Sequence, residues 1–196
     1  MTHKENMKFD QILVIDIECT CWEKPRADDI SEIIEIGISP IDTKSGNILE
    51  SRSIIVKPIH SEVSEFCTRL TTLTQEDVDS GISFKDACKI LVNEYQSKKY
   101  MWSSYGYFDK KEFVSQCDRE RVEYPFSKAH INIKMLFALK YALVKDIGMV
   151  KALKFLDIPL IGIHHRGIDD SRNVAKILSK ILFDSANANK AVKSTF

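Results

Sequence analysis

Long apolar runs separated by short polar turns fill the first part of the chain, a pattern typical of β-strands. Residues 11–17 (QILVIDI) are almost wholly apolar until charge appears near the end, which predicts a central buried strand. Residues 32–41 and 48–57 are rich in isoleucine and predict two more strands, joined by a turn at residues 45–47 (SGN). We therefore expect the first three strands to form an antiparallel meander.

Beyond residue 60 the apolar positions recur every three or four residues, the spacing of amphipathic helices. Thr74 followed by Asp77 is a typical helix start, because the two can cap each other. Helices are predicted at residues 62–70, 83–95, 109–117, 147–156 and 170–183. Another opens at Thr74, and short strands are predicted at residues 100–104 and 129–133. The second of these strands is followed by a helix that ends near residue 143. Strands that then alternate with helices indicate an α/β fold with helices on both faces of a five-stranded sheet.

The length and composition of the chain are those of a single globular domain. The 196 residues are 44% apolar and 29% charged, and no apolar run approaches the roughly 18 residues of a membrane span. The polar start lacks an apolar signal core, which predicts a cytoplasmic protein with no membrane association. We expect an N-terminal polar tail at residues 1–8, one domain at residues 9–184 and a C-terminal polar tail at residues 185–196.

Cysteine content and charge narrow the function only slightly. Five scattered cysteines in a reducing compartment argue against a disulfide framework, and Cys19 and Cys21 lack the second pair that a zinc site needs. Net charge is zero, which argues against nonspecific coating of polyanions. Residues 16–50 carry three basic and nine acidic side chains, whereas residues 140–196 carry ten basic and five acidic ones. These poles suit a cation and a phosphate, or they are simply solvated faces.

The first candidate for chemistry is the pair Asp16 and Glu18 at the end of the first strand. Side chains alternate along a strand, so both carboxylates project to the same side. Burying unpaired charges costs several kcal/mol, and a hard divalent cation such as Mg²⁺ is an efficient counter-charge. The alternative is a strand that emerges into solvent at its carboxyl end.

Asp109 begins a predicted helix directly after the fourth strand. With Glu112 three residues later it resembles a capping box, so Asp109 is a good candidate for a helix N-cap. A residue at the carboxyl edge of a sheet also faces the crevice in which α/β proteins bind ligands. Both roles are compatible with the sequence.

The third candidate is the segment HHRGIDDS at residues 164–171. Histidine titrates near neutrality and suits a general base, while either aspartate suits a helix start. His164 with Asp169 and His165 with Asp170 have the same spacing, so spacing cannot choose between them. A polar loop without chemistry is the alternative.

The three motifs in this order resemble the DEDDh family of 3'-5' exonucleases. The stretches at residues 66–79, 104–113, 124–126, 131–133 and 165–175 are similar to its histone-mRNA exonuclease-like and KapD-like subgroup, over residues 9–184. The resemblance implies a ribonuclease H-like fold, with Asp16, Glu18, Asp109 and Asp170 as the carboxylates and His165 as the histidine. It also aligns Asp170 rather than Asp169 with the motif, which leaves Asp169 as the predicted N-cap.

The resemblance implies hydrolysis from the 3' end with release of nucleoside 5'-monophosphates. Two Mg²⁺ ions, for which Mn²⁺ would substitute, would hold the scissile phosphate. Asp16 would bridge both ions, Glu18 and Asp170 would bind one, and Asp109 would bind the other. His165 would take the proton from the attacking water.

Substrate contacts are implied for residues beside these motifs: Cys19, Thr20, Phe108 and Arg166, with Lys176 as a further candidate for phosphate. Phe108 could instead pack in the core, and the two cations could be solvated. Single-stranded RNA is expected in preference to DNA, by resemblance alone. Two other functions stay open, a nucleic-acid-binding module without turnover and a ribonuclease H-like endonuclease.

Overall fold

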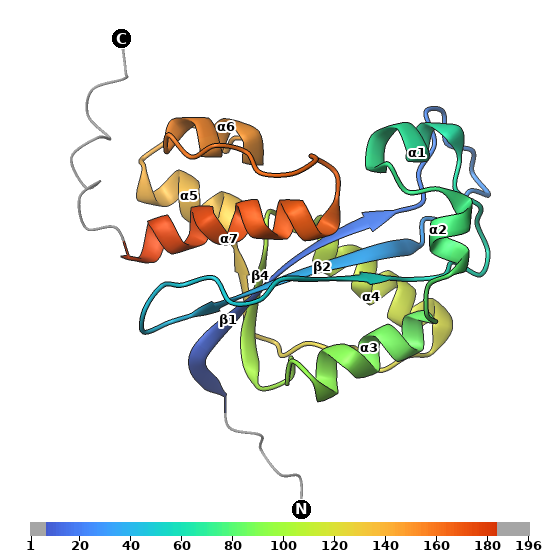
Figure 1. Cartoon of the computed structure of the whole chain (residues 1–196), viewed down its shortest axis with the longest axis horizontal. Coiled ribbons are helices and arrows are strands. Elements are labelled where there is room, and N and C mark those ends of the chain that lie inside the picture. Colours follow the sequence, from blue (N-terminus) through green and yellow to red (C-terminus); the bar gives the residue numbers. More distant parts are fainter. Residues whose placement is uncertain (1–6, 184–196) are drawn as a thin grey trace, which may run out of the picture.

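A five-stranded mixed sheet forms the centre of the molecule, as seen in a computed structural model that describes residues 7–183 (Figure 1). The strand order is β3-β2-β1-β4-β5. The first three strands form the predicted antiparallel meander, and β4 and β5 run parallel to β1. The strands are β1 (Lys8–Cys19), β2 (Ile33–Asp42), β3 (Arg52–Ile55), β4 (Tyr100–Ser104) and β5 (His130–Asn132).

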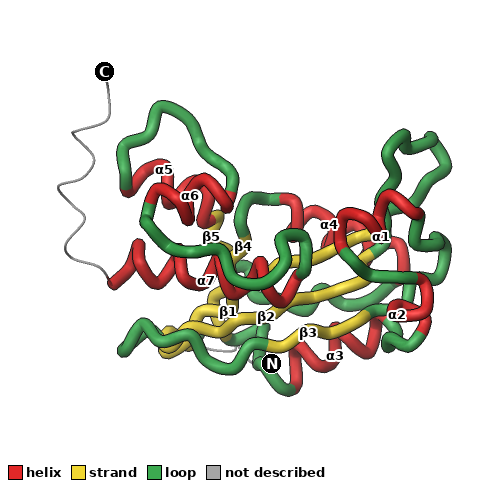
Figure 2. Tube along the Cα trace, turned by 45° about the horizontal axis from the view of Figure 1, so that its top comes forward, coloured by secondary structure: helices red, strands yellow, loops and turns green. Residues whose placement is uncertain are grey.

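Helices cover both faces of the sheet (Figure 2), which confirms the predicted fold class. Seven helices lie within residues 7–183. They are α1 (Glu65–Thr71), α2 (Gln75–Asp79), α3 (Phe84–Asn93), α4 (Phe108–Glu120), α5 (Ile133–Lys140), α6 (Met149–Phe155) and α7 (Gly167–Phe183). Thr74 and Asp77 form the predicted capping box at the start of α2. No helix within residues 7–183 is both long and apolar enough to cross a membrane, and all five cysteines are free thiols.

Several element boundaries differ from the predictions. The predicted third strand is interrupted, because Ile48 makes only an isolated bridge and β3 begins at Arg52. The first strand starts at Lys8, inside the predicted N-terminal tail, and ends two residues later than predicted. The predicted C-terminal tail lies outside the described residues.

Side chains alternate along β1, so the strand contributes to a hydrophobic core on each face of the sheet. The same alternation sets the direction of Asp16 and Glu18. Leu13, Ile15 and Ile17 pack in the core beneath α3 and α4, whereas Ile12 and Val14 pack in the core beneath α5, α6 and α7. Asp16 and Glu18 have the same parity as Val14, so they continue its face toward α7. The strand therefore ends with two carboxylates beneath the start of that helix.

The start of α7 lies directly on β2 through two glycines. A Cβ on Gly37 would be 1.8 Å from the carbonyl oxygen of Gly167, a distance that real structures do not show. Gly37 is paired with Asp16 across the β1–β2 ladder. The absence of a side chain at Gly37 is thus what lets α7 reach the acidic end of β1.

Gly37→Ala is therefore expected to destabilise the fold strongly. The new methyl group would meet backbone, which cannot rotate aside, and overpacking of this kind costs about 1–3 kcal/mol or more. Gly148→Ala is the control, since a Cβ there meets nothing within 4 Å. Denaturant unfolding should show a large loss for the first variant only; equal curves would contradict the close contact.

Candidate active site

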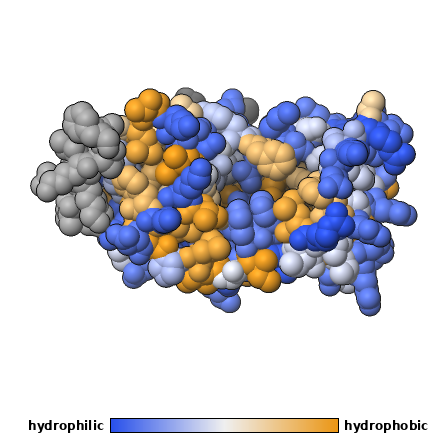
Figure 3. All heavy atoms as spheres, turned by 90° about the horizontal axis from the view of Figure 1, so that it is seen from above, coloured by the Kyte–Doolittle hydropathy of each residue, from blue (hydrophilic) through white to orange (hydrophobic). Residues whose placement is uncertain are grey.

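A pocket of about 600 Å³ lies where β1 and β4 end. Figure 3 looks onto this side of the molecule, where a hollow near the middle separates areas of apolar surface. The pocket is lined by all five residues predicted for catalysis and by three of the four predicted for substrate contact: Asp16, Glu18, Asp109, His165, Asp170, Cys19, Thr20 and Phe108. Segments far apart in the sequence thus meet in one cavity.

Three of the carboxylates form a compact group that suits a divalent cation. One oxygen each from Asp16, Glu18 and Asp170 lies within 4.8 Å of the other two. The Oδ1 atom of Asp170 is buried and has no hydrogen-bond partner. Because a buried polar atom normally has a partner, this oxygen and its acidic neighbours fit a hard cation such as Mg²⁺.

The electrostatics of the group point the same way. Burial, followed by repulsion from Asp170, raises the pKa of Glu18 to about 8. Burial, followed by repulsion from Asp109, raises the pKa of Asp16 well above its usual range. The protein alone therefore disfavours the charged forms, and a bound cation would reverse that preference.

The raised pKa values of Asp16 and Glu18 predict that the metal-free protein loses stability as the pH rises. A carboxyl whose pKa is higher in the folded state stabilises the fold below its ordinary value of 4.5, and the contribution is lost on the way to pH 8. Melting temperatures in EDTA should fall from pH 5 to pH 8, with a smaller fall for Glu18→Gln. Parallel pH profiles for the two proteins would count against the raised pKa of Glu18.

Asp109 lies beside this group, on α4. Its Oδ1 atom accepts a hydrogen bond from the backbone amide of Ile17 at 3.1 Å. Burial raises the pKa of Asp109 to about 6, and hydrogen bonds to its carboxylate partly oppose the rise. The predicted N-cap role is wrong: Tyr107 occupies the N-cap, and Asp109 is inside the first turn with its carboxylate turned toward β1.

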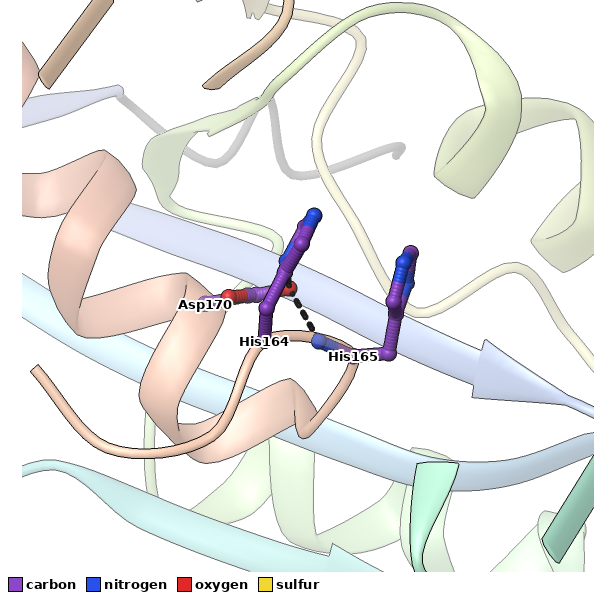
Figure 4. Close-up of side chains that lie close together, drawn as sticks. All are labelled: His164, His165 and Asp170. Carbon is purple, nitrogen blue, oxygen red and sulfur yellow. Dashed lines mark hydrogen bonds and ion pairs between the residues drawn. The ribbon is translucent and has the colours of Figure 1, made fainter. Parts of the chain in front are cut away.

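Two histidines stand beside Asp170 on the loop that leads into α7 (Figure 4). Their rings stack with centroids 3.9 Å apart. The Oδ2 atom of Asp170 accepts a hydrogen bond from the amide of His165 at 2.9 Å and lies 2.8 Å from Nδ1 of His164. Burial, followed by the charge of His164, lowers the pKa of His165, which favours the neutral ring that a general base requires.

The predicted N-cap role of Asp169 is also wrong. The helix α7 starts at Gly167, so Asp169 lies within its first turn. Its carboxylate accepts a hydrogen bond from the backbone amide of Ile163 at 2.9 Å and thereby closes the histidine loop. Asp169 points away from the carboxylate group, whereas Asp170 is part of it.

Comparison with known proteins identifies the chain. Residues 13–178 match the RNase_T family, described as exonuclease. This chain belongs to the RNase_T exonuclease family. The nuclease domain of 3'hExo, a DEDDh family member solved bound to rAMP, superposes on this exonuclease domain with a TM-score of 0.82 at 30% identity, covering 92% of this chain and 95% of that one.

A 3'-5' exoribonuclease 1 from Rattus norvegicus is 33% identical over 186 residues. The match covers 90% of this chain but 54% of the rat protein, so the chain spans about half the length of that relative. A structure of 3'-end specific recognition of histone mRNA stem-loop by 3'-exonuclease has a TM-score of 0.79 at 28% identity, covering 92% of this chain and 84% of that one.

The predicted substrate contacts of the exonuclease domain differ in their environment. Phe108 is 56% exposed at the pocket, so it is not a core residue. Cys19 and Thr20 are buried, and the Thr20 hydroxyl donates to the carbonyl of Ile30. Arg166 does not line the pocket; its Nε atom lies 3.0 Å from buried Glu35. The contacts of these residues with nucleotides stay predictions.

Several residues of the exonuclease pocket were not predicted. Its apolar wall is formed by residues from separate segments, including Trp22, Leu70 and Met149, and no local pattern distinguishes them from core residues. Glu35 does not line the pocket, but it too was missed although it carried a signal, because it is an acidic residue within the isoleucine-rich strand β2 and has the same parity as Gly37. A charge in a buried strand indicates a specific partner.

Proposed function

We propose that this chain is a metal-dependent 3'-5' exonuclease that hydrolyses single-stranded RNA to nucleoside 5'-monophosphates. The proposal is carried by the carboxylates of Asp16, Glu18 and Asp170, which have oxygens within 4.8 Å of one another and include the unpartnered buried Oδ1 of Asp170. It is supported by the names of the relatives, a 3'-5' exoribonuclease and a nuclease domain bound to rAMP, which is a nucleoside monophosphate.

The carboxylate group would hold one Mg²⁺ ion, and Asp109 with Asp16 would hold a second. Bound divalent ions activate water and stabilise the negative charge that develops on the leaving 3' oxygen. Mn²⁺ should substitute, because it also prefers carboxylate ligands.

The residues of the chain would supply the proton transfer and the orientation of the substrate. His165, at the pocket with a lowered pKa, would accept the proton of the attacking water. Asp170 would hold the backbone of His165 through the 2.9 Å hydrogen bond. Exposed Phe108 would stack on a base or a sugar, a contact that is worth about 1–3 kcal/mol per base in single-strand binders.

Digestion of matched 5'-labelled RNA and DNA oligomers tests the proposal. Mg²⁺ should support progressive shortening of the RNA from its 3' end with release of nucleoside 5'-monophosphates, and EDTA should abolish it. Circular RNA of the same sequence should survive. Binding without release would favour the binding module, cleavage of the circle would favour an endonuclease, and DNA cut tenfold faster than RNA would exclude the RNA preference.

A further inference from the structure

A fifth acidic residue, Glu35, lies beside the carboxylate group on the neighbouring strand. It is paired with Glu18 across the β1–β2 ladder and is fully buried. Its carboxylate accepts hydrogen bonds from the Ser53 hydroxyl at 2.6 Å, from Nε of Arg166 at 3.0 Å and from the amide of Gly167 at 2.9 Å. Glu35 is thus satisfied by protein groups and does not need a cation.

Two of the partners of Glu35 lie where the histidine loop joins α7. Arg166 directly follows His165, and Gly167 is the first residue of α7. Nη1 of Arg166 also donates to the Thr72 hydroxyl at the end of α1, at 3.3 Å. The ion pair with Glu35 and the hydrogen bond to Thr72 therefore tie the start of α7 to two other elements, β2 and α1.

The backbone of His165 is held tightly between these contacts. It adopts a left-handed conformation with φ of 67°, and its amide donates to Asp170. Such a conformation is uncommon outside glycine and persists only where surrounding contacts impose it. The contacts on either side are the hydrogen bond to Asp170 and the anchoring of Arg166 on Glu35.

We infer that Glu35 and Arg166 are positioning residues that hold the start of α7, and with it the general base, in place. The inference rests on the proposed function. It differs from the phosphate contact predicted for Arg166, because the Nε atom and Nη1 of that side chain are directed at Glu35 and Thr72. Arg166 would then act on the rate of the chemical step and not on substrate affinity.

Steady-state kinetics on a single-stranded RNA oligomer with Mg²⁺ test this role. Arg166→Met and Glu35→Gln should each lower kcat by about tenfold or more with KM within about twofold, because small misplacements of catalytic groups cost this much. The double variant should lose little more than either single variant, since both break one contact. Arg166→Lys keeps the positive charge but lacks the planar guanidinium group, so it should recover part of kcat. It replaces Arg166→Met in the test if that variant fails to fold.

Arg52→Met is the matched control. Arg52 lies on the edge strand β3, and its ion pair with Glu94 at the end of α3 is exposed. It should leave kcat unchanged. Unchanged kcat in Glu35→Gln and Arg166→Met would overturn the inference. A raised KM with normal kcat in Arg166→Met would overturn it in favour of substrate contact.

Hydrogen exchange of residues 163–170 separates this inference from the proposed function. Glu35→Gln should speed exchange in this segment by about tenfold or more, whereas Arg52→Met should not. If the wild-type protein releases no nucleotides, the proposed function is wrong, and exchange alone decides whether the pair holds the segment. Equal exchange in Glu35→Gln and wild type would overturn the inference.

Discussion

Replacement of Asp16 by asparagine is expected to abolish nucleotide release and to raise the melting temperature of the metal-free protein. The two effects have one cause. Asp16 is surrounded by other carboxylates, and its pKa is raised well above the usual range by burial and by repulsion from Asp109 and Glu18. Asparagine is neutral at every pH, so the variant avoids the cost of burying this carboxyl among other acidic groups in the absence of metal.

The same charge is what a divalent cation would bind. Loss of a metal ligand removes several kcal/mol of transition-state stabilisation, so turnover should fall by about a thousandfold or more. Single-turnover digestion and thermal melting in EDTA measure both effects. The exposed Asp28→Asn, in the loop after β1, is the control and should change neither. Substantial activity of Asp16→Asn in Mg²⁺, or of the wild type in excess EDTA, would refute the metal site.

The second large effect is expected from His165→Ala, a loss of about a hundredfold or more in kcat. The ring of His165 lines the pocket, and burial lowers its pKa, so it is neutral and able to accept a proton at neutral pH. The rise of wild-type kcat with pH should lie below pH 6.5 and should disappear in the variant. Rates across pH 5–8 on one RNA oligomer provide the measurement.

His164→Ala is the matched comparison and should cost far less. Nδ1 of His164 lies 2.8 Å from Asp170, which fits a role in orienting that carboxylate. The two rings stack in parallel, so proximity alone does not assign the roles. A nearly normal His165→Ala together with an inactive His164→Ala would reverse them.

Local rules were enough for the framework of the fold and for the first acidic pair. The meander, the five strands and the helices on both faces followed from periodicity and turn residues. That Asp16 and Glu18 share a side followed from alternation along one strand, and their oxygens lie within one cluster. These features depend on neighbours in the sequence, so the sequence alone could predict them.

The capping roles were the part that local rules assigned wrongly. Asp109 and Asp169 both occur where an N-cap is expected, yet α4 begins at Phe108 and α7 at Gly167, so both aspartates lie inside the first turn. The Asp109 carboxylate accepts from the amide of Ile17, and Asp169 accepts from the amide of Ile163. Capping preferences of about 1 kcal/mol are easily outweighed where a buried amide such as that of Ile17 needs an acceptor, while Asp169 instead closes the exposed loop at Ile163.

The sequence by itself determined an α/β domain whose first strand ends in two carboxylates on one face. Only the tertiary structure decided which distant groups complete the site. Close packing of Gly37 on Gly167 brings Asp170 to that strand, and buried Glu35 takes Arg166 as its partner. The physical reason is that alternation and helical period are set by covalent geometry, whereas long-range partners are selected by packing and by the cost of burying an unpaired charge.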